Sequence, residues 1–202
     1  MEASAVSTRD RLSTEAARLF AQRGYHGTSI GDLAAALGIQ KASVYSHIKG
    51  KEDLLAEIAL AGAEAFHGAL DAVPEADPEQ RLRLALRAHL GVVDQQLEVA
   101  TVFLNEWRYL TGPARERFLA ERHHYERRIR RSFEDAVAAG ALRADLDVRR
   151  AVLAFLSIGN WAYTWMAHSI DVDREAEAFW SLLVDGAGGD RLPADRSVAR
   201  GV

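Results

Sequence analysis

Apolar side chains recur every three to four residues along most of this chain, which is the spacing of one face of an α-helix. In the first such segment, Leu12, Ala16, Leu19 and Phe20 follow this spacing. No segment alternates apolar and polar residues over the length of a strand, so the pattern predicts an all-α fold of about nine helices. The expected helices cover residues 7–23, a short stretch ending near 37, 40–47, 51–70, 79–97, 98–110, 114–139, 147–168 and 173–186.

Glycine and proline mark the ends of these helices, because glycine favours helix C-termini and proline stops or starts a helix. Gly24, Gly38 and Gly50 separate the first four, and Pro74 and Pro78 flank an acidic linker. We therefore expect two domains, at 8–68 and 75–187, on either side of this linker. Residues 188–202 lack apolar periodicity and are expected to form a flexible tail.

Composition narrows the class of protein. The chain has 202 residues, of which 49% are hydrophobic and 27% charged, with no cysteine and a net charge of −4. These values are typical of a globular protein, and they exclude disulfides and cysteine-based zinc sites. We expect a cytoplasmic location, because the N-terminus lacks the apolar stretch of a signal peptide. The apolar run at 151–167 is too short and too polar to predict a membrane span.

The most specific signal lies between residues 28 and 51, where two short helices flank a glycine turn. This arrangement predicts a helix-turn-helix whose second helix enters the major groove of DNA. From residue 38 to 51 there are three lysines and no acidic residue, although the whole chain is weakly acidic. Such local segregation suits phosphate binding, but a basic stretch is also compatible with a simple solvated face.

Individual residues of this segment have the chemistry that DNA contacts need. Gln40 and Ser43 can bond base edges, and Tyr45 can pack on a sugar or a thymine methyl group. Thr28 and Lys51 stand at helix N-termini, where we expect each to hold a phosphate. A lysine is unfavourable beside the helix dipole there, so Lys51 suggests an external anion rather than a folding role.

Five short motifs follow one another within residues 8–68: 16–25 (AARLFAQRGY), 28–34 (TSIGDLA), 37–39 (LGI), 44–48 (VYSHI) and 51–55 (KEDLL). With this set the chain resembles the TetR family of bacterial repressors. The resemblance implies a homodimer that binds a pseudo-palindromic double-stranded operator and contains a helical effector domain. The positions that match or lie among the family's DNA contacts are Thr28, Gln40, Lys41, Ala42, Ser43, Tyr45, His47 and Lys51. Gln40 replaces a common serine and Ile48 a common phenylalanine, which puts base preference and core packing in question.

The helix expected at 147–168 is apolar nearly all round, so it should be buried both on its own core and on a partner. Paired with the helix at 173–186, it predicts a four-helix bundle across a two-fold axis. The expected interface residues are Leu153, Leu156, Ser157, Phe179, Trp180 and Leu183.

Two charged residues fall on apolar stripes, Glu106 on one helix and Arg122 on the next. Because a buried charge is costly unless paired, we expect these two side chains to form an ion pair. The pair can be purely structural, or it can border an effector pocket. The expected pocket residues are Phe103, Glu106, Trp107, Arg122, Tyr125, Trp161 and Trp165, although such aromatic residues are also typical of a plain core.

The second half of the chain resembles TetR regulators that respond to acyl-CoA thioesters, in residues 102–110, in Arg122 with Tyr125, and in residues 138–143. The resemblance implies an acyl chain among the aromatic residues and arginines near the phosphates. We expect a ligand-released repressor, with an acyl-CoA or an uncharged hydrophobic compound as alternative effectors. No catalytic residues, metal site, cofactor or membrane partner are expected, because the enzyme motifs and helical His pairs are missing. A helical adaptor or enzyme without DNA binding is the remote alternative.

Overall fold

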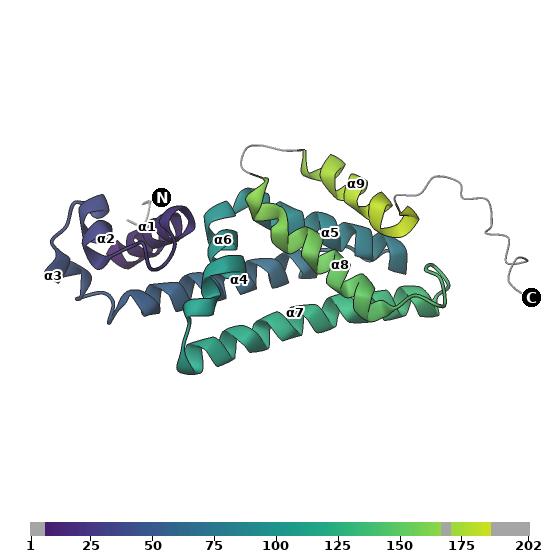
Figure 1. Ribbon diagram of the computed structural model, residues 1–202, viewed down its shortest axis with the longest axis horizontal. Coiled ribbons are helices and arrows are strands. Elements are labelled where there is room, and N and C mark those ends of the chain that lie inside the picture. Colours follow the sequence, from purple (N-terminus) through teal and green to yellow (C-terminus); the bar gives the residue numbers. More distant parts are fainter. Residues whose placement is uncertain (1–6, 167–170, 187–202) are drawn as a thin grey trace, which may run out of the picture.

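The computed structural model describes residues 7–166 and 171–186, and the secondary structure in these ranges is entirely helical (Figure 1). The prediction of an all-α fold is therefore confirmed. The α-helices are α1 (Thr8–Arg23), α2 (Ile30–Leu37), α3 (Lys41–Val44), α4 (Lys51–Asp71), α5 (Pro78–Gln95), α6 (Leu97–Asn105), α7 (Gly112–Ala138), α8 (Val148–Trp161) and α9 (Val172–Asp185). Two short 3-10 helices, η1 (Glu106–Tyr109) and η2 (Ala162–Thr164), follow α6 and α8.

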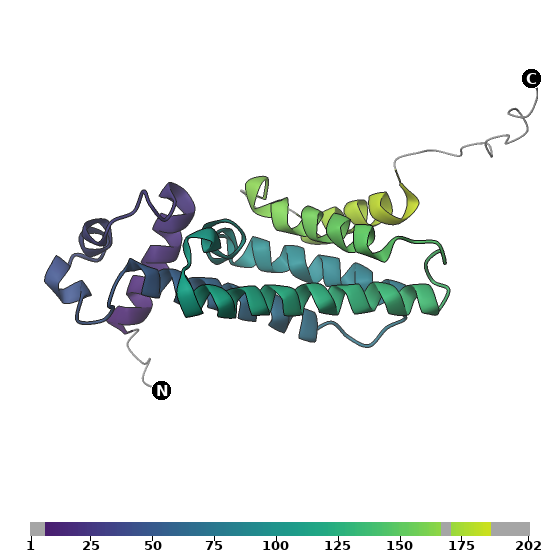
Figure 2. The same cartoon turned by 60° about the horizontal axis from the view of Figure 1, so that its bottom comes forward.

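The molecule is elongated, with α1, α2 and α3 gathered at one end against the start of α4 (Figure 1). Helix α4 runs from that end into the larger part of the molecule, where it packs on α5, α6 and α7. Figure 2 shows α7 lying along the body, with α8 and α9 forming a layer above it. Helix α9 packs mainly on α5, and α8 packs on α7. One helix thus belongs both to the small end and to the main body.

Local sequence explains where the first helices begin and end. Ser7 and Ser29 each cap a helix, and each exchanges hydrogen bonds with an aspartate three residues later, Asp10 and Asp32. This capping box satisfies two backbone N–H groups that would otherwise lack partners. Gly38 ends α2 in the left-handed conformation, with φ +65°, which only glycine adopts at little cost.

Three predicted helices are shorter than expected. The helix predicted at 40–47 ends at Val44, because residues 45–47 form turns that lead to the buried side chain of Ile48. The helix predicted at 98–110 changes to the 3-10 turn η1 at Glu106, whose side chain bonds another part of the chain. The helix predicted at 147–168 changes at η2, and its last two residues lie outside the described ranges, as does the predicted tail at 188–202.

A continuous hydrophobic core joins the two ends of the molecule. Leu54 and Leu55 of α4 are fully buried near the small end, and Phe66 of the same helix is buried in the main body. A displacement of α4 therefore changes the packing in both parts, since protein interiors are close-packed and transmit strain. Among the described helices, none is both long enough and apolar enough to cross a membrane.

Candidate functional site

The segment predicted to read DNA lies on the surface. Gln40, Lys41, Ala42, Ser43, Tyr45 and His47 are all exposed. Tyr45 is 52% exposed, which is unusual for so large a ring, whereas Val44 beside it is fully buried. The buried side of this segment packs on α2, and the exposed side presents small, polar and basic groups together. This is the arrangement that base and phosphate contacts require.

Two predicted phosphate contacts are already engaged within the protein. The Thr28 side chain is 1% exposed, and its hydroxyl donates to the carbonyl oxygens of Leu19 and Gly24 at 3.3 and 3.1 Å. The Lys51 Nζ donates to the carbonyl oxygens of Tyr25 and Thr28, and it lies 4.0 Å from the centre of the Tyr25 ring.

The folded chain therefore already provides partners for Lys51, so its place at a helix N-terminus does not by itself require an external anion. That Lys51 holds a phosphate stays a prediction. The two carbonyl oxygens and the ring face stabilise its ammonium group without any ligand. Burial lowers the pKa of Lys51. Lys51 joins the start of α4 to the loop that precedes α2. Thr28 joins the same loop to the end of α1.

A cavity of about 280 Å³ lies between α4, α5, α6, α7 and α8 in the main body. Four of the predicted pocket residues line it: Phe103, Trp107, Arg122 and Tyr125. The other lining residues were not predicted for the pocket: Phe66, His89, Leu119, His123, Glu126, Leu156 and Asn160. Of these, Leu156 was expected at the dimer interface instead. The wall thus combines four aromatic rings and two leucines with five polar side chains, and such a mixture of apolar and polar groups is typical of small-molecule sites.

The polar groups of this cavity differ in their burial: His89 and Tyr125 are buried, Arg122 is half-buried, and His123 is exposed. The Arg122 guanidinium lies 4.8 Å from the centre of the Trp107 ring, and burial lowers its pKa. His89 is 2% exposed, and its Nδ1 lies 3.1 Å from the Tyr125 hydroxyl. Burial lowers the pKa of His89 to about 4, although the backbone of Gly159 opposes this shift, and burial raises the pKa of Tyr125. Near neutral pH both side chains are therefore uncharged, and Arg122 is the cation of the wall.

Within the described part of the chain, Glu106 and Arg122 form no ion pair, so that prediction was wrong. Glu106 is only 5% exposed, and it faces away from the cavity. Its Oε2 accepts the backbone N–H of Tyr25 at 2.6 Å, and its Oε1 accepts the Asn105 amide at 2.8 Å. Hydrogen bonds satisfy the buried carboxylate in place of a cation, and Arg122 is satisfied by aromatic faces.

The turn η1 therefore contacts both the cavity and the small end of the molecule. Trp107 lines the cavity and stacks on Phe118, with ring centres 5.5 Å apart. Tyr109 stacks on Tyr25 at 5.6 Å, next to the Glu106 hydrogen bond. A four-residue turn thus connects a ligand-sized cavity with the loop that leads into the helix-turn-helix.

The apolar face predicted for a partner is exposed in part. Leu153 is 50% exposed, Ser157 is exposed, and Leu156, Phe179 and Leu183 are half-buried. Trp180 is only 4% exposed, so its prediction as a surface contact was wrong; the ring belongs to the core. Trp161 and Trp165, expected in the pocket, are 64% and 37% exposed and lie outside the cavity.

Comparison with known proteins gives two family matches that together span most of the chain. Residues 13–58 match the profile of bacterial regulatory proteins of the tetR family. Residues 75–187, more than half of the chain, match the profile of tetracyclin repressor-like C-terminal domains.

Individual relatives agree with these matches. The HTH-type transcriptional repressor KstR2 of Rhodococcus jostii (strain RHA1) is 28% identical over 184 residues, covering 88% of this chain and 90% of that protein. The TetR family regulator PfmR from Thermus thermophilus superposes with a TM-score of 0.81 at 32% identity, covering 89% of this chain and all of that one. AibR, in complex with isovaleryl coenzyme A and operator DNA, superposes with a TM-score of 0.80 at 30% identity, covering 88% of this chain and 98% of that one.

Proposed function

This chain belongs to the TetR family of transcriptional regulators, and on that basis we propose that it is a repressor which an acyl-CoA thioester releases from its operator. The family consists of DNA-binding regulators rather than enzymes, and its ligand-responsive repressors act as dimers. The observation that carries the proposal is η1, which connects an aromatic cavity with the helix-turn-helix.

The proposed DNA contacts are the exposed residues of the segment 40–47. Lys41 and His47 would contact phosphates, while Gln40, Ser43 and Tyr45 would reach base edges or sugars, with Ala42 allowing close approach. Thr28 and Lys51 would act indirectly, by fixing the loop before α2 against the start of α4. The division proposed for the chain places this unit at 8–68 and the effector and dimer unit at 75–187.

The proposed effector site is the 280 Å³ cavity, whose size and aromatic wall suit a short branched acyl chain. Arg122 is the cation available at this wall for a polar or anionic part of the ligand. The AibR complex supports the ligand class, because that related protein binds isovaleryl coenzyme A together with operator DNA. An uncharged hydrophobic compound is the second candidate, because four aromatic rings and two leucines line the cavity.

The route from ligand to DNA follows from the contacts of η1. A ligand that displaces Trp107 or Arg122 moves the turn, and Glu106 and Tyr109 then shift the loop at Tyr25. Phe66 of α4 also lines the cavity, so the same ligand can displace α4, which transmits the movement to the helix-turn-helix. A ligand changes operator affinity only as far as it prefers one of the two conformations.

We place the dimer interface on α8 and α9, where Leu153, Ser157, Leu156, Phe179 and Leu183 share an apolar surface with exposed Leu182. An isologous two-fold contact of this kind buries the same residues on both partners. Leu153→Glu should turn the dimer into a monomer in sedimentation, whereas Glu177→Gln on the opposite side of α9, paired with Arg83 of α5, should leave the dimer intact.

The decisive experiment is fluorescence anisotropy on duplexes taken from the DNA upstream of the coding sequence. We expect isovaleryl-CoA to release the bound duplex, and coenzyme A or free isovalerate to leave it bound. Arg122→Met should weaken the response to the thioester while the affinity for DNA without effector stays unchanged. Release by an uncharged hydrophobic compound but by no thioester would overturn the proposed ligand class. Failure to bind any upstream duplex would count against the proposed role as a repressor that binds an operator there.

A further inference from the structure

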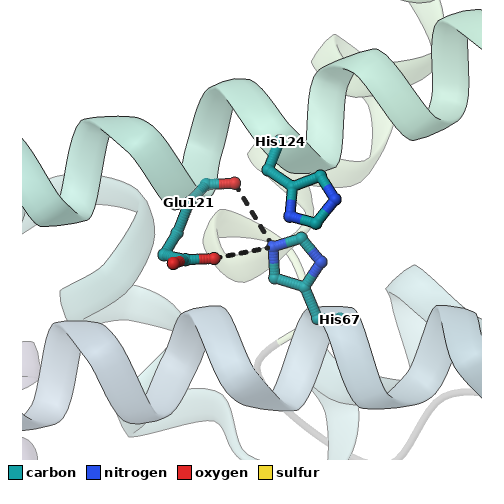
Figure 3. Close-up of side chains that lie close together, drawn as sticks. All are labelled: His67, Glu121 and His124. Atoms are coloured by element: carbon teal, nitrogen blue, oxygen red, sulfur yellow. Dashed lines mark hydrogen bonds and ion pairs between the residues drawn. The ribbon is translucent and has the colours of Figure 1, made fainter.

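A cluster of three potential metal ligands lies between α4 and α7, on the side of α7 away from the effector cavity. Figure 3 shows Glu121 and His124 of α7 pointing toward His67 of α4. One ligand atom from each residue lies within 4.8 Å of the other two. Neither the proposed DNA contacts nor the proposed effector site includes these residues.

We propose that His67, Glu121 and His124 form a binding site for a divalent first-row transition metal such as zinc, which would cross-link α4 to α7. Two imidazoles and one carboxylate are a ligand set that zinc accepts, with a fourth position left for water. Glu121 and His124 are three residues apart, so they lie on the same face of α7. The third ligand comes from the helix that runs into the helix-turn-helix.

The spacing of the ligand atoms fits a zinc ion. With bonds of about 2.1 Å and tetrahedral angles, two zinc ligands lie about 3.4 Å apart. The His67 Nε2 is 3.5 Å from the Glu121 Oε2, and the rings of His67 and His124 have centres 4.9 Å apart. His124 is exposed and Glu121 half-buried, so a rotation of their side chains can close the remaining gap.

Arg128 competes with a metal for this site. Its Nη1 lies 3.3 Å from the His67 Nδ1, and since arginine can only donate, Nδ1 accepts and Nε2 carries the proton. Metal binding through Nε2 requires the other tautomer, with the proton on Nδ1. The bond from Arg128 to His67 must then break, while its ion pair with Asp71 at 2.6 Å can remain. Removal of the Arg128 charge should therefore increase the affinity for the metal.

The test is calorimetric titration of zinc chloride into the chelator-treated full chain without a polyhistidine tag. We expect one zinc ion per chain, and a loss of affinity of about tenfold or more in His67→Ala, His124→Ala and Glu121→Gln. His123→Ala is the matched control, because His123 is the neighbouring histidine on α7 but faces the effector cavity. Arg128→Gln should bind zinc more tightly than the unmodified chain.

Cobalt absorption and thermal melting complete the test without operator or effector, so they are independent of the proposed function. Cobalt should give visible bands typical of three protein ligands. Zinc should raise the melting temperature of the unmodified chain, of His123→Ala and of Arg128→Gln, but not that of the three ligand variants. Equal zinc affinity in the unmodified chain, His67→Ala and His124→Ala would overturn the site, as would no uptake of zinc. An unchanged affinity in Arg128→Gln would overturn the competition between Arg128 and the metal.

Discussion

Replacement of Glu106 tests the connection between the effector half and the DNA-binding half. In Glu106→Ala the Tyr25 N–H loses its acceptor at 2.6 Å, and the Asn105 amide loses its acceptor at 2.8 Å. A hydrogen bond to a charged group contributes about 1.5–3 kcal/mol. Because Tyr25 is half-buried and can regain part of its hydration, we expect the free energy of unfolding to fall by about 2 kcal/mol.

A double-mutant cycle with Arg122→Met shows which partner Glu106 has. Arg122 stacks on Trp107, whereas Glu106 bonds the backbone of Tyr25, so the two substitutions should be additive to within about 0.5 kcal/mol. Urea denaturation monitored by circular dichroism gives the four free energies. Anisotropy on operator DNA then reports whether Glu106→Ala also weakens the release of DNA by effector.

Two results would refute this reasoning. A coupling energy above about 1 kcal/mol between Glu106 and Arg122 would mean that the two charges interact directly. Unchanged stability together with an unchanged effector response in Glu106→Ala would mean that the bond to Tyr25 contributes neither to folding nor to the switch.

Three further predictions concern acid stability, helix packing and DNA binding. Burial lowers the pKa of His89 to about 4, against about 6.5 when unfolded, so the unfolded state alone takes up the proton as pH falls below 6.5. This group should lower the free energy of unfolding by about 2 kcal/mol between pH 7 and 5. In chemical denaturation, the free energy of unfolding of His89→Gln should fall by that amount less over the same range. Gly62→Ala places a Cβ 2.6 Å from the Phe103 Cβ and should lower the melting temperature, whereas Gly68→Ala, in open space on the same helix, should raise it. Lys41→Glu should weaken operator binding and flatten its dependence on salt concentration without affecting dimerisation; an unchanged salt slope would remove Lys41 from the phosphate contacts.

The sequence determined the all-helical fold and the position of the helix-turn-helix. Helical periodicity, capping serines and the glycine at 38 are local features, and hydrogen bonds within a few residues decide them. The proposed DNA contacts between Gln40 and His47 followed from the same local pattern, and the structure places them on the surface. Four residues that line the cavity could also be predicted from the sequence, because an arginine among aromatic residues on an apolar stripe indicates a polar group inside a core.

Only the tertiary structure decided which partners the buried charged and polar groups have. Apolar stripes indicated that Glu106 and Arg122 face the core, and Glu106 is buried and Arg122 half-buried. A stripe does not show which neighbouring helix a side chain meets, and the two residues have different partners. His89 and Phe66 carried no local signal for the cavity, because any buried residue of α4 or α5 fits the same periodicity. Likewise, Lys51 binds carbonyl oxygens more than twenty residues away, and His67 meets Glu121 across 54 positions. Such contacts depend on how helices pack, and the three- to four-residue periodicity of a single helix contains no information about its neighbour.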